Sequence, residues 1–155
     1  MPAVVERILF NILAKDLTTS AAFYRQLANF EQIYTSDWYV VLAVPGHTGF
    51  QLGLIDQVSE FAPRHAWGTA AGGYLTLVVD DVFAALERAR EMGVEIIETP
   101  TSLEYGQTRA LIRDPNGVII DLSTPTEALA SRGDVAFAPS PKDTAVDQQQ
   151  PEENE

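Results

Sequence analysis

The sequence has no cysteine among its 155 residues, and it also lacks long apolar runs and an excess of basic side chains. The absence of cysteine excludes a disulfide framework, thiol chemistry and thiolate ligands for a metal. No stretch approaches the roughly 18 apolar residues that a membrane-spanning helix requires. Because the first residues also lack the basic and then apolar pattern of a secretory signal, we expect a cytoplasmic protein with no membrane partner.

The formal net charge of −12 argues against a nucleic-acid partner, because nucleic acid requires a basic surface. This acidity serves solubility, and it also suits a cationic ligand. It is concentrated near the end of the chain, since the residues from Gly133 onward hold six acidic side chains and one lysine. We expect a short helix from Thr126 and an acidic, disordered tail over residues 129–155.

Residues with obvious chemistry are few. The only histidines are His47 and His65, which lie in a turn and in a connecting segment. No serine or threonine stands at a readable spacing from a base, and no glycine-rich phosphate loop is present. We therefore identify no catalytic residue and no cofactor from the sequence.

The chain does contain an internal duplication with an offset of about 65 residues. Residues 9–16 and 74–81 each read as a strand that ends in aspartate and leads into a helix. Each copy closes with a turn containing proline and glycine followed by a strand, over 45–52 and 115–122. The duplication predicts one domain over residues 1–128, built from modules at about 6–56 and 73–125.

Apolar periodicity predicts the elements of each module. In the first module, Asp16 or Thr18 caps a helix, and in the second Asp80 or Asp81 does so before Gly93 ends it. The strands are expected at 7–14, 32–36, 38–44, 49–55, 74–80, 94–98, 108–113 and 118–123.

Two segments carry a resemblance to a known family. They are Asp16-Leu17-x-x-Ser20-x-x-Phe23-Tyr24 and Arg113-Asp114-Pro115-Asn116-Gly117. Together with the duplicated order of elements, they resemble the vicinal oxygen chelate superfamily of glyoxalases, bleomycin-resistance proteins and extradiol dioxygenases. The resemblance implies an α+β fold in which two tandem βαβββ modules form a half-barrel cleft.

Metal-dependent members of that superfamily take one ligand from the first strand and one from the last strand of each module. The resemblance maps these positions onto Leu9, Gln51, Tyr74 and Asp121. Of these four side chains, only the carboxylate of Asp121 is a good ligand for a divalent ion, which needs three or four. We therefore expect no metal, as in the metal-free branch that resembles bleomycin-resistance proteins.

Strand alternation assigns mixed polar faces to the cleft and apolar faces, such as Ile8, Phe10 and Ile12, to the helices. The polar groups either satisfy one another or contact a ligand, and aromatic residues of the connections form walls. The expected ligand-binding residues are Asn11, Trp38, Gln51, Trp67, Tyr74, Thr76, Tyr105, Arg109 and Asp121.

The resemblance to bleomycin-resistance proteins thus implies a homodimer that binds a small organic molecule, such as an antibiotic, without altering it. One alternative is a metal-dependent lyase or dioxygenase that uses His47 or His65 with Gln51 and Asp121. A second is a metal-free isomerase or epimerase with Asp121 as its general base. A third is a regulatory module whose acidic tail recruits a partner.

Overall fold

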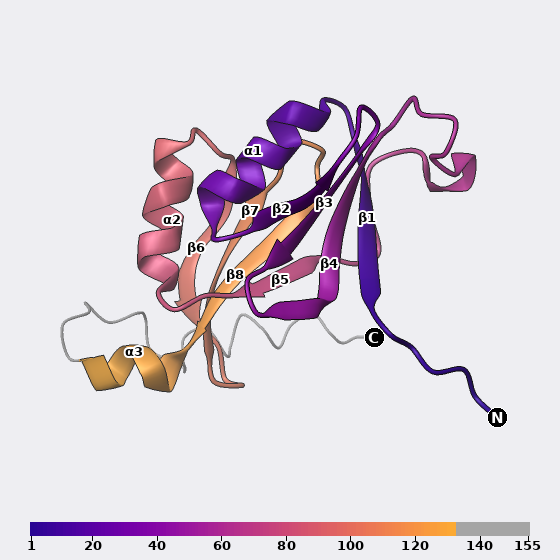
Figure 1. Ribbon diagram of the computed structural model, residues 1–155. Helices are drawn as coiled ribbons and strands as arrows, with labels where there is room; N and C mark the ends of the chain where they lie inside the picture. Colours follow the sequence, from indigo (N-terminus) through magenta and orange to yellow (C-terminus); the bar gives the residue numbers. More distant parts are fainter. Residues whose placement is uncertain (133–155) are drawn as a thin grey trace. The chain divides into compact units, whose positions relative to one another are not determined.

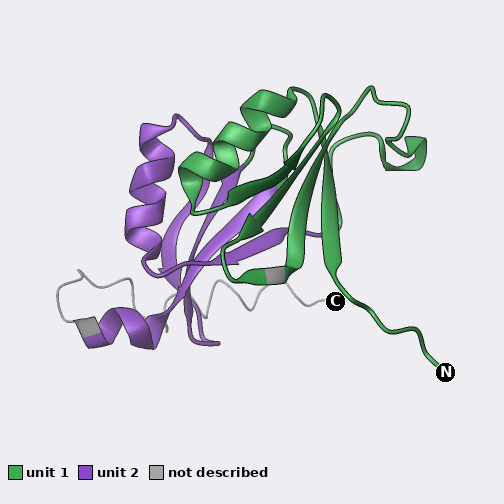
Figure 2. Ribbon diagram, in the orientation of Figure 1, with its two compact units in different colours: residues 1–72, 114–118 green, residues 73–113, 119–155 purple. Residues whose placement is uncertain are grey.

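The computed structural model describes residues 1–132, which form two compact units (Figure 2). Unit 1 contains residues 1–72 together with 114–118, and unit 2 contains residues 73–113 and 119–132. Each unit contains one βαβββ module, so the predicted α+β fold with two such modules is confirmed. Within the described part of the chain, no helix has the length and apolarity needed to cross a membrane.

Unit 1 is a four-stranded sheet with a helix on one face (Figure 1). Its elements are β1 (Ile8–Ala14), α1 (Leu17–Leu27), β2 (Glu31–Thr35), β3 (Tyr39–Val44) and β4 (His47–Asp56), followed by the short 3-10 helix η1 (Arg64–Ala66). The strand order is β1-β4-β3-β2, with β1 parallel to β4 and the other pairs antiparallel. The residue that caps α1 is Asp16, one of the two candidates predicted from the sequence. Its carboxylate accepts a hydrogen bond from the amide of Thr19 at 2.9 Å.

Unit 2 repeats this plan. Its elements are β5 (Leu75–Val78), α2 (Val82–Glu91), β6 (Ile96–Ser102), β7 (Gln107–Arg113), β8 (Ile119–Pro125) and α3 (Thr126–Arg132). The strand order is β5-β8-β7-β6, and α2 packs against β6, β7 and β8. Asp81 caps α2 through the amides of Phe83 and Ala84, and Gly93 follows its last turn at a φ of 73°.

The predicted helix from Thr126 is present as α3 and extends to Arg132. Residues 129–132, which the sequence places in the acidic tail, therefore belong to a helix. The remainder of the predicted tail, residues 133–155, lies outside the described residues.

The two faces of each sheet differ in the side chains that they carry. In β8, Ile120 and Leu122 are fully buried on the side of α2, while Asp121 alternates to the opposite face. In unit 1 the prediction that Ile8 and Phe10 pack under a helix is wrong, because they are 53% and 42% exposed. The contacts of α1 fall mainly on β2, β3 and β4, so the start of β1 lies beyond its cover.

The turn after β7 belongs to unit 1 and is held there by its side chains. The buried carboxylate of Asp114 accepts a hydrogen bond from the Tyr24 hydroxyl at 2.8 Å and others from the amides of Asn116 and Val118. The Asn116 side chain donates to Ser20 Oγ at 2.9 Å. The two sequence segments that carry the family resemblance thus contact each other directly.

Replacing Asp114 by alanine should lower the free energy of unfolding by about 2–4 kcal/mol, because three buried donors lose their acceptor. Tyr24→Phe, which removes only one of these hydrogen bonds, should cost about 1 kcal/mol. Urea unfolding monitored by circular dichroism measures both changes. Asp37→Ala, at an exposed loop position, is the control, and equal midpoints for Asp114→Ala and this control would contradict the assignment.

Candidate functional site

The face of the unit 2 sheet that points away from α2 carries a group of polar side chains, which we call the polar face. Thr76 on β5 is the register partner of Asp121 on β8, and its hydroxyl donates to Asp121 Oδ2 at 3.2 Å. Arg109 on β7 lies opposite Ser123, which places it diagonally across from Asp121. Three neighbouring strands therefore bring these side chains together.

Asp121 is the most constrained member of the polar face. Its side chain is buried, with the residue only 4% exposed, and Oδ1 has no hydrogen-bond partner among the described residues. Burial raises the pKa of Asp121, the positive charge of Arg109 and the hydrogen bond from Thr76 oppose this rise, and Glu98 adds to it. A buried carboxylate with an unused oxygen is costly, so this atom is suited to receive a donor from a ligand.

Arg109 lies between Asp121 and the edge strand β6, which carries Glu98. Its Nη2 donates to Glu98 Oε1 at 3.3 Å, while its buried Nε has no hydrogen-bond partner among residues 1–132. Arg109 also donates a hydrogen bond to the Tyr105 hydroxyl. Burial raises the pKa of that hydroxyl, the positive charge of Arg109 opposes the rise, and Asp121 and Tyr74 add to it. The two tyrosines remain more than 60% exposed and therefore present ring surface beside the charged groups.

Five of the residues predicted from the sequence thus gather on the polar face of unit 2. They are Tyr74, Thr76, Tyr105, Arg109 and Asp121. The sequence analysis missed two further members, Glu98 and Gln107. Gln107 had a usable signal, because it precedes Arg109 by two residues in a strand and therefore lies on the same face.

The other predicted residues lie in unit 1. Asn11 accepts a hydrogen bond from the Tyr39 hydroxyl at 3.3 Å, and Trp38 stacks on Tyr39 with ring centroids 5.2 Å apart. Gly53 permits this arrangement, because a Cβ there would lie 2.0 Å from Asn11 Oδ1. The sequence-based set omitted Tyr39, although this residue joins Asn11 to Trp38.

Gln51 and Trp67 have different surroundings. Gln51 is the register partner of Leu9 and is only 4% exposed. Trp67 is 52% exposed and packs under the guanidinium of Arg64, with 4.8 Å between Cζ and the ring centroid. Trp67 is therefore a surface aromatic residue of the segment after η1.

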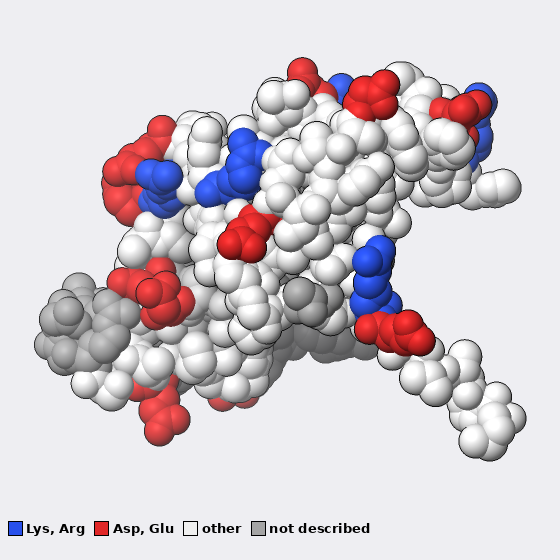
Figure 3. All heavy atoms as spheres, in the orientation of Figure 1, with Lys and Arg blue, Asp and Glu red and all other residues white. Residues whose placement is uncertain are grey.

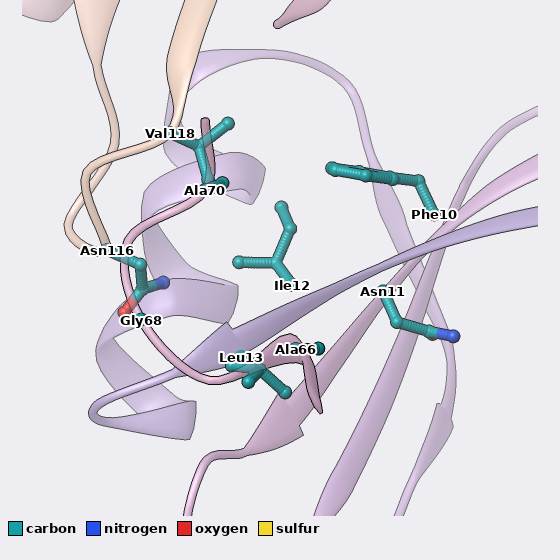
Figure 4. A pocket seen from close by; sticks show the side chains of 9 residues that line it. All are labelled: Phe10, Asn11, Ile12, Leu13, Ala66, Gly68, Ala70, Asn116 and Val118. Atoms are coloured by element: carbon teal, nitrogen blue, oxygen red, sulfur yellow. The ribbon is translucent and has the colours of Figure 1, made fainter. Parts of the chain in front are cut away.

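Unit 1 also contains two hollows. The first has a volume of about 70 Å³ and lies between β1, the segment after η1 and the turn after β7 (Figure 4). That volume is well below the 300–1,000 Å³ of typical ligand pockets. Its lining residues are Phe10, Asn11, Ile12, Leu13, Ala66, Gly68, Ala70, Asn116 and Val118.

The second hollow has a volume of about 320 Å³ and lies between α1 and the β2–β3 connection. Three of its polar side chains are joined to one another, because Arg25 donates to Gln32 and Gln32 donates to Thr35. None of the described residues that line this hollow has a buried polar atom without a partner, as Asp121 Oδ1 is.

The four residues that the resemblance maps onto metal positions do not fit a divalent ion. In unit 1 the pair is Leu9 and Gln51, and in unit 2 Asp121 is the only carboxylate at such a position. Within residues 1–132, no three His, Cys, Asp or Glu side chains are grouped closely enough to hold a metal. His47 also stands four residues from Gln51 along β4, a separation of roughly 13 Å, which is too long for a shared ion.

Residues 7–122 match the model of the Glyoxalase/Bleomycin resistance protein/Dioxygenase superfamily. The chain therefore belongs to this superfamily. A comparison with curated proteins finds no match.

Solved structures of the same superfamily share the fold. A family enzyme from Burkholderia phytofirmans PsJN is 19% identical with a TM-score of 0.67, covering 79% of this chain and 99% of that one. A superfamily member from Sphaerobacter thermophilus is 22% identical with a TM-score of 0.61, covering 78% and 98%. A lactoylglutathione lyase from Agrobacterium tumefaciens is 20% identical with a TM-score of 0.58, covering 79% and 94%.

The raised pKa of Asp121 predicts a pH-dependent effect of Asp121→Asn. Because the folded-state pKa lies above the usual value of 3.8, ionisation of Asp121 in the folded protein costs stability as pH rises through that raised pKa. The variant should therefore have the higher free energy of unfolding at pH 7, and the difference should shrink as pH falls toward 3.8. Urea unfolding at several pH values measures this, with Asp37→Asn as the control, and a constant difference across pH would contradict it.

Proposed function

We propose that this protein belongs to the metal-free, bleomycin-resistance-like branch of its superfamily and binds a small organic molecule on the polar face of unit 2. The main support is the buried carboxylate of Asp121, whose Oδ2 accepts a hydrogen bond from Thr76 while Oδ1 has no donor within residues 1–132. A site built for a metal would supply further ligands, whereas Arg109 and the two tyrosines are groups that recognise organic molecules. We propose sequestration of an antibiotic or similar compound as the biological role.

The charges of the polar face favour a ligand with a cationic part. Asp121 and Glu98 together outweigh the single positive charge of Arg109, so one negative charge is uncompensated. Tyr74 and Tyr105 add exposed rings that favour cations and aromatic groups. On the face of the molecule shown in Figure 3, acidic and basic groups are scattered among uncharged side chains, without the continuous basic field that nucleic acid requires.

We also propose that the protein acts as a cytoplasmic homodimer. Ile8 and Phe10 on β1 and Phe50 on β4 lie on one side of their sheet, and each is more than 40% exposed. A contiguous apolar patch of this kind favours burial against another protein surface. Sedimentation velocity of the wild type and of Phe10→Ser distinguishes a dimer from a monomer.

A second candidate is metal-free isomerase or epimerase chemistry, with Asp121 as the general base. The observation that favours it is the raised pKa of Asp121, because a base works best when its pKa approaches the working pH. Recovery of the bound molecule chemically unchanged after long incubation supports sequestration, and its conversion supports this second candidate.

Asp121→Asn should weaken the binding of a cationic ligand by about 10- to 100-fold, because a charge-assisted hydrogen bond contributes about 1.5–3 kcal/mol. Isothermal titration calorimetry with a panel of cationic glycopeptides and aromatic amines measures this. Asp37→Asn is the matched control for net charge and should bind as the wild type does. Binding that is absent across the panel, or equally tight in both variants, would contradict the proposal.

The metal-free assignment makes a separate prediction. Protein purified without chelators should contain far less than one equivalent of zinc, nickel, manganese or iron, because the donor set does not offset dehydration of the ion. Elemental analysis measures the content, and added ions should leave the melting temperature unchanged. A stoichiometric transition metal would overturn the assignment.

A further inference from the structure

The second hollow of unit 1 has no part in the function proposed for unit 2. It lies between α1 and the β2–β3 connection, and every residue that lines it belongs to unit 1. Its volume of about 320 Å³ lies at the lower end of the range of roughly 300–1,000 Å³ that is typical of ligand pockets. The hollow therefore has room for a small organic molecule.

One face of α1 forms a wall of this hollow. Leu17, Ala21 and Arg25 follow one another at a spacing of four residues and so lie on the same side of the helix. Because the side chain of Ala21 is short, space remains between the longer side chains of Leu17 and Arg25. Ala21 and Val40, each only 3% exposed, provide an apolar floor.

The charge of the hollow differs from that of the chain. Arg25 is the only charged side chain among the described residues that line it, although the chain has a formal net charge of −12. Asp16 is engaged as the cap of α1 by the amide of Thr19. Glu31 precedes Gln32 in β2 and therefore alternates to the opposite face of the strand. The hollow is thus a positively charged place in an acidic protein and attracts an anion.

The hydrogen bonds of the lining leave donors for a ligand. Arg25 donates to Gln32 Oε1, and Gln32 Nε2 donates to Thr35 Oγ1. A guanidinium has five N–H donors, so the bond to Gln32 leaves the others for a ligand or water. The Thr35 hydroxyl accepts in this chain of bonds and keeps its own O–H as a donor. Donors grouped around a guanidinium are the complement of a carboxylate.

We propose that this hollow is a second binding site, which takes a small carboxylate attached to an apolar body. The carboxylate accepts hydrogen bonds from the guanidinium of Arg25, and the apolar body lies over Ala21 and Val40. A dianion such as a phosphate monoester brings a second negative charge that no other described lining residue neutralises, so a monoanion is favoured. The site does not depend on the binding proposed for unit 2.

Four compounds with one phenyl ring test the preferred charge on the full chain. They are benzoate, phenyl phosphate, benzamide and benzylamine. In two-dimensional proton–nitrogen NMR titrations at neutral pH, benzoate should shift the amides of Thr18, Ala21 and Ser36. It should bind more tightly than phenyl phosphate, and at least about tenfold more tightly than benzamide or benzylamine, because only a carboxylate makes charge-assisted bonds without excess charge. A benzoate affinity no higher than that of another compound, or shifts confined to other residues, would overturn the proposal.

A variant of the guanidinium locates the effect. Arg25→Gln should lower the affinity for benzoate at least about tenfold and that for benzamide less than about twofold, since only the ion pair is lost. Arg25 is exposed, so the variant should keep the fold, and its NMR spectrum verifies this. Arg90→Gln, in the last turn of the corresponding helix α2, makes the same change in net charge and should bind benzoate as the wild type does. Equal losses in both variants would trace the effect to net charge and overturn the site.

The outcomes separate this inference from the function proposed for unit 2. Asp121→Asn should leave the affinity for benzoate unchanged, because Asp121 is not a lining residue of the hollow. If the cationic panel binds and benzoate does not, the second site fails and the proposed function stands. If benzoate binds in an Arg25-dependent manner and no cationic compound binds, the second site stands and the proposed function fails.

Discussion

The one-sided cover of each sheet by a helix is the constraint on which the rest of this structure depends. Burial of Ile120 and Leu122 on the side of α2 contributes apolar stabilisation, and the period of two along a strand then forces Asp121 to the opposite face. The polar face is therefore a direct consequence of how the core is packed. The same rule in unit 1 places Asn11 and Gly53 opposite to the buried side chains of Leu52 and Leu54.

The polar face also contains a side chain, Asp121, whose burial is energetically unfavourable. Asp121 loses hydration on burial, and Thr76 and Arg109 offset only part of that loss. A carboxylate that served only the stability of the sheet would be replaced without penalty by an apolar residue, as at the buried neighbouring positions of β8. The burial of Asp121 is therefore a cost to stability that its neighbours leave partly uncompensated.

Much of the fold was predictable because its signals are local. The capping positions of Asp16 and Asp81 and the glycine after α2 follow from the residue types, and the eight expected strands all occur with shifts at their ends. The ends of the strands were less predictable: β5 begins at Leu75, so Tyr74 lies just before the strand. Periodicity also predicted the burial of Ile8 and Phe10 incorrectly, since an apolar strand face does not reveal how far the helix extends over it.

The candidate site was predictable only in part, because its details depend on contacts between distant residues. Alternation correctly grouped Thr76 with Asp121, yet nothing in the sequence pairs Arg109 with Glu98 or Asn11 with Tyr39. The bond between Tyr24 and Asp114 joins residues 90 positions apart. Two motifs that are separate signals in the sequence are one hydrogen-bonded cluster in the molecule.

That cluster bears on how a duplicated gene can evolve. Residues 114–118 arise in the second copy but complete the first, where they satisfy Ser20 and Tyr24. Once this arrangement was established, loss of the second copy would leave Ser20 and Tyr24 of the first without their hydrogen-bond partners. The ancestral repeat thereby ceased to be a self-sufficient building block, and inheritance of the two halves became obligatorily joint.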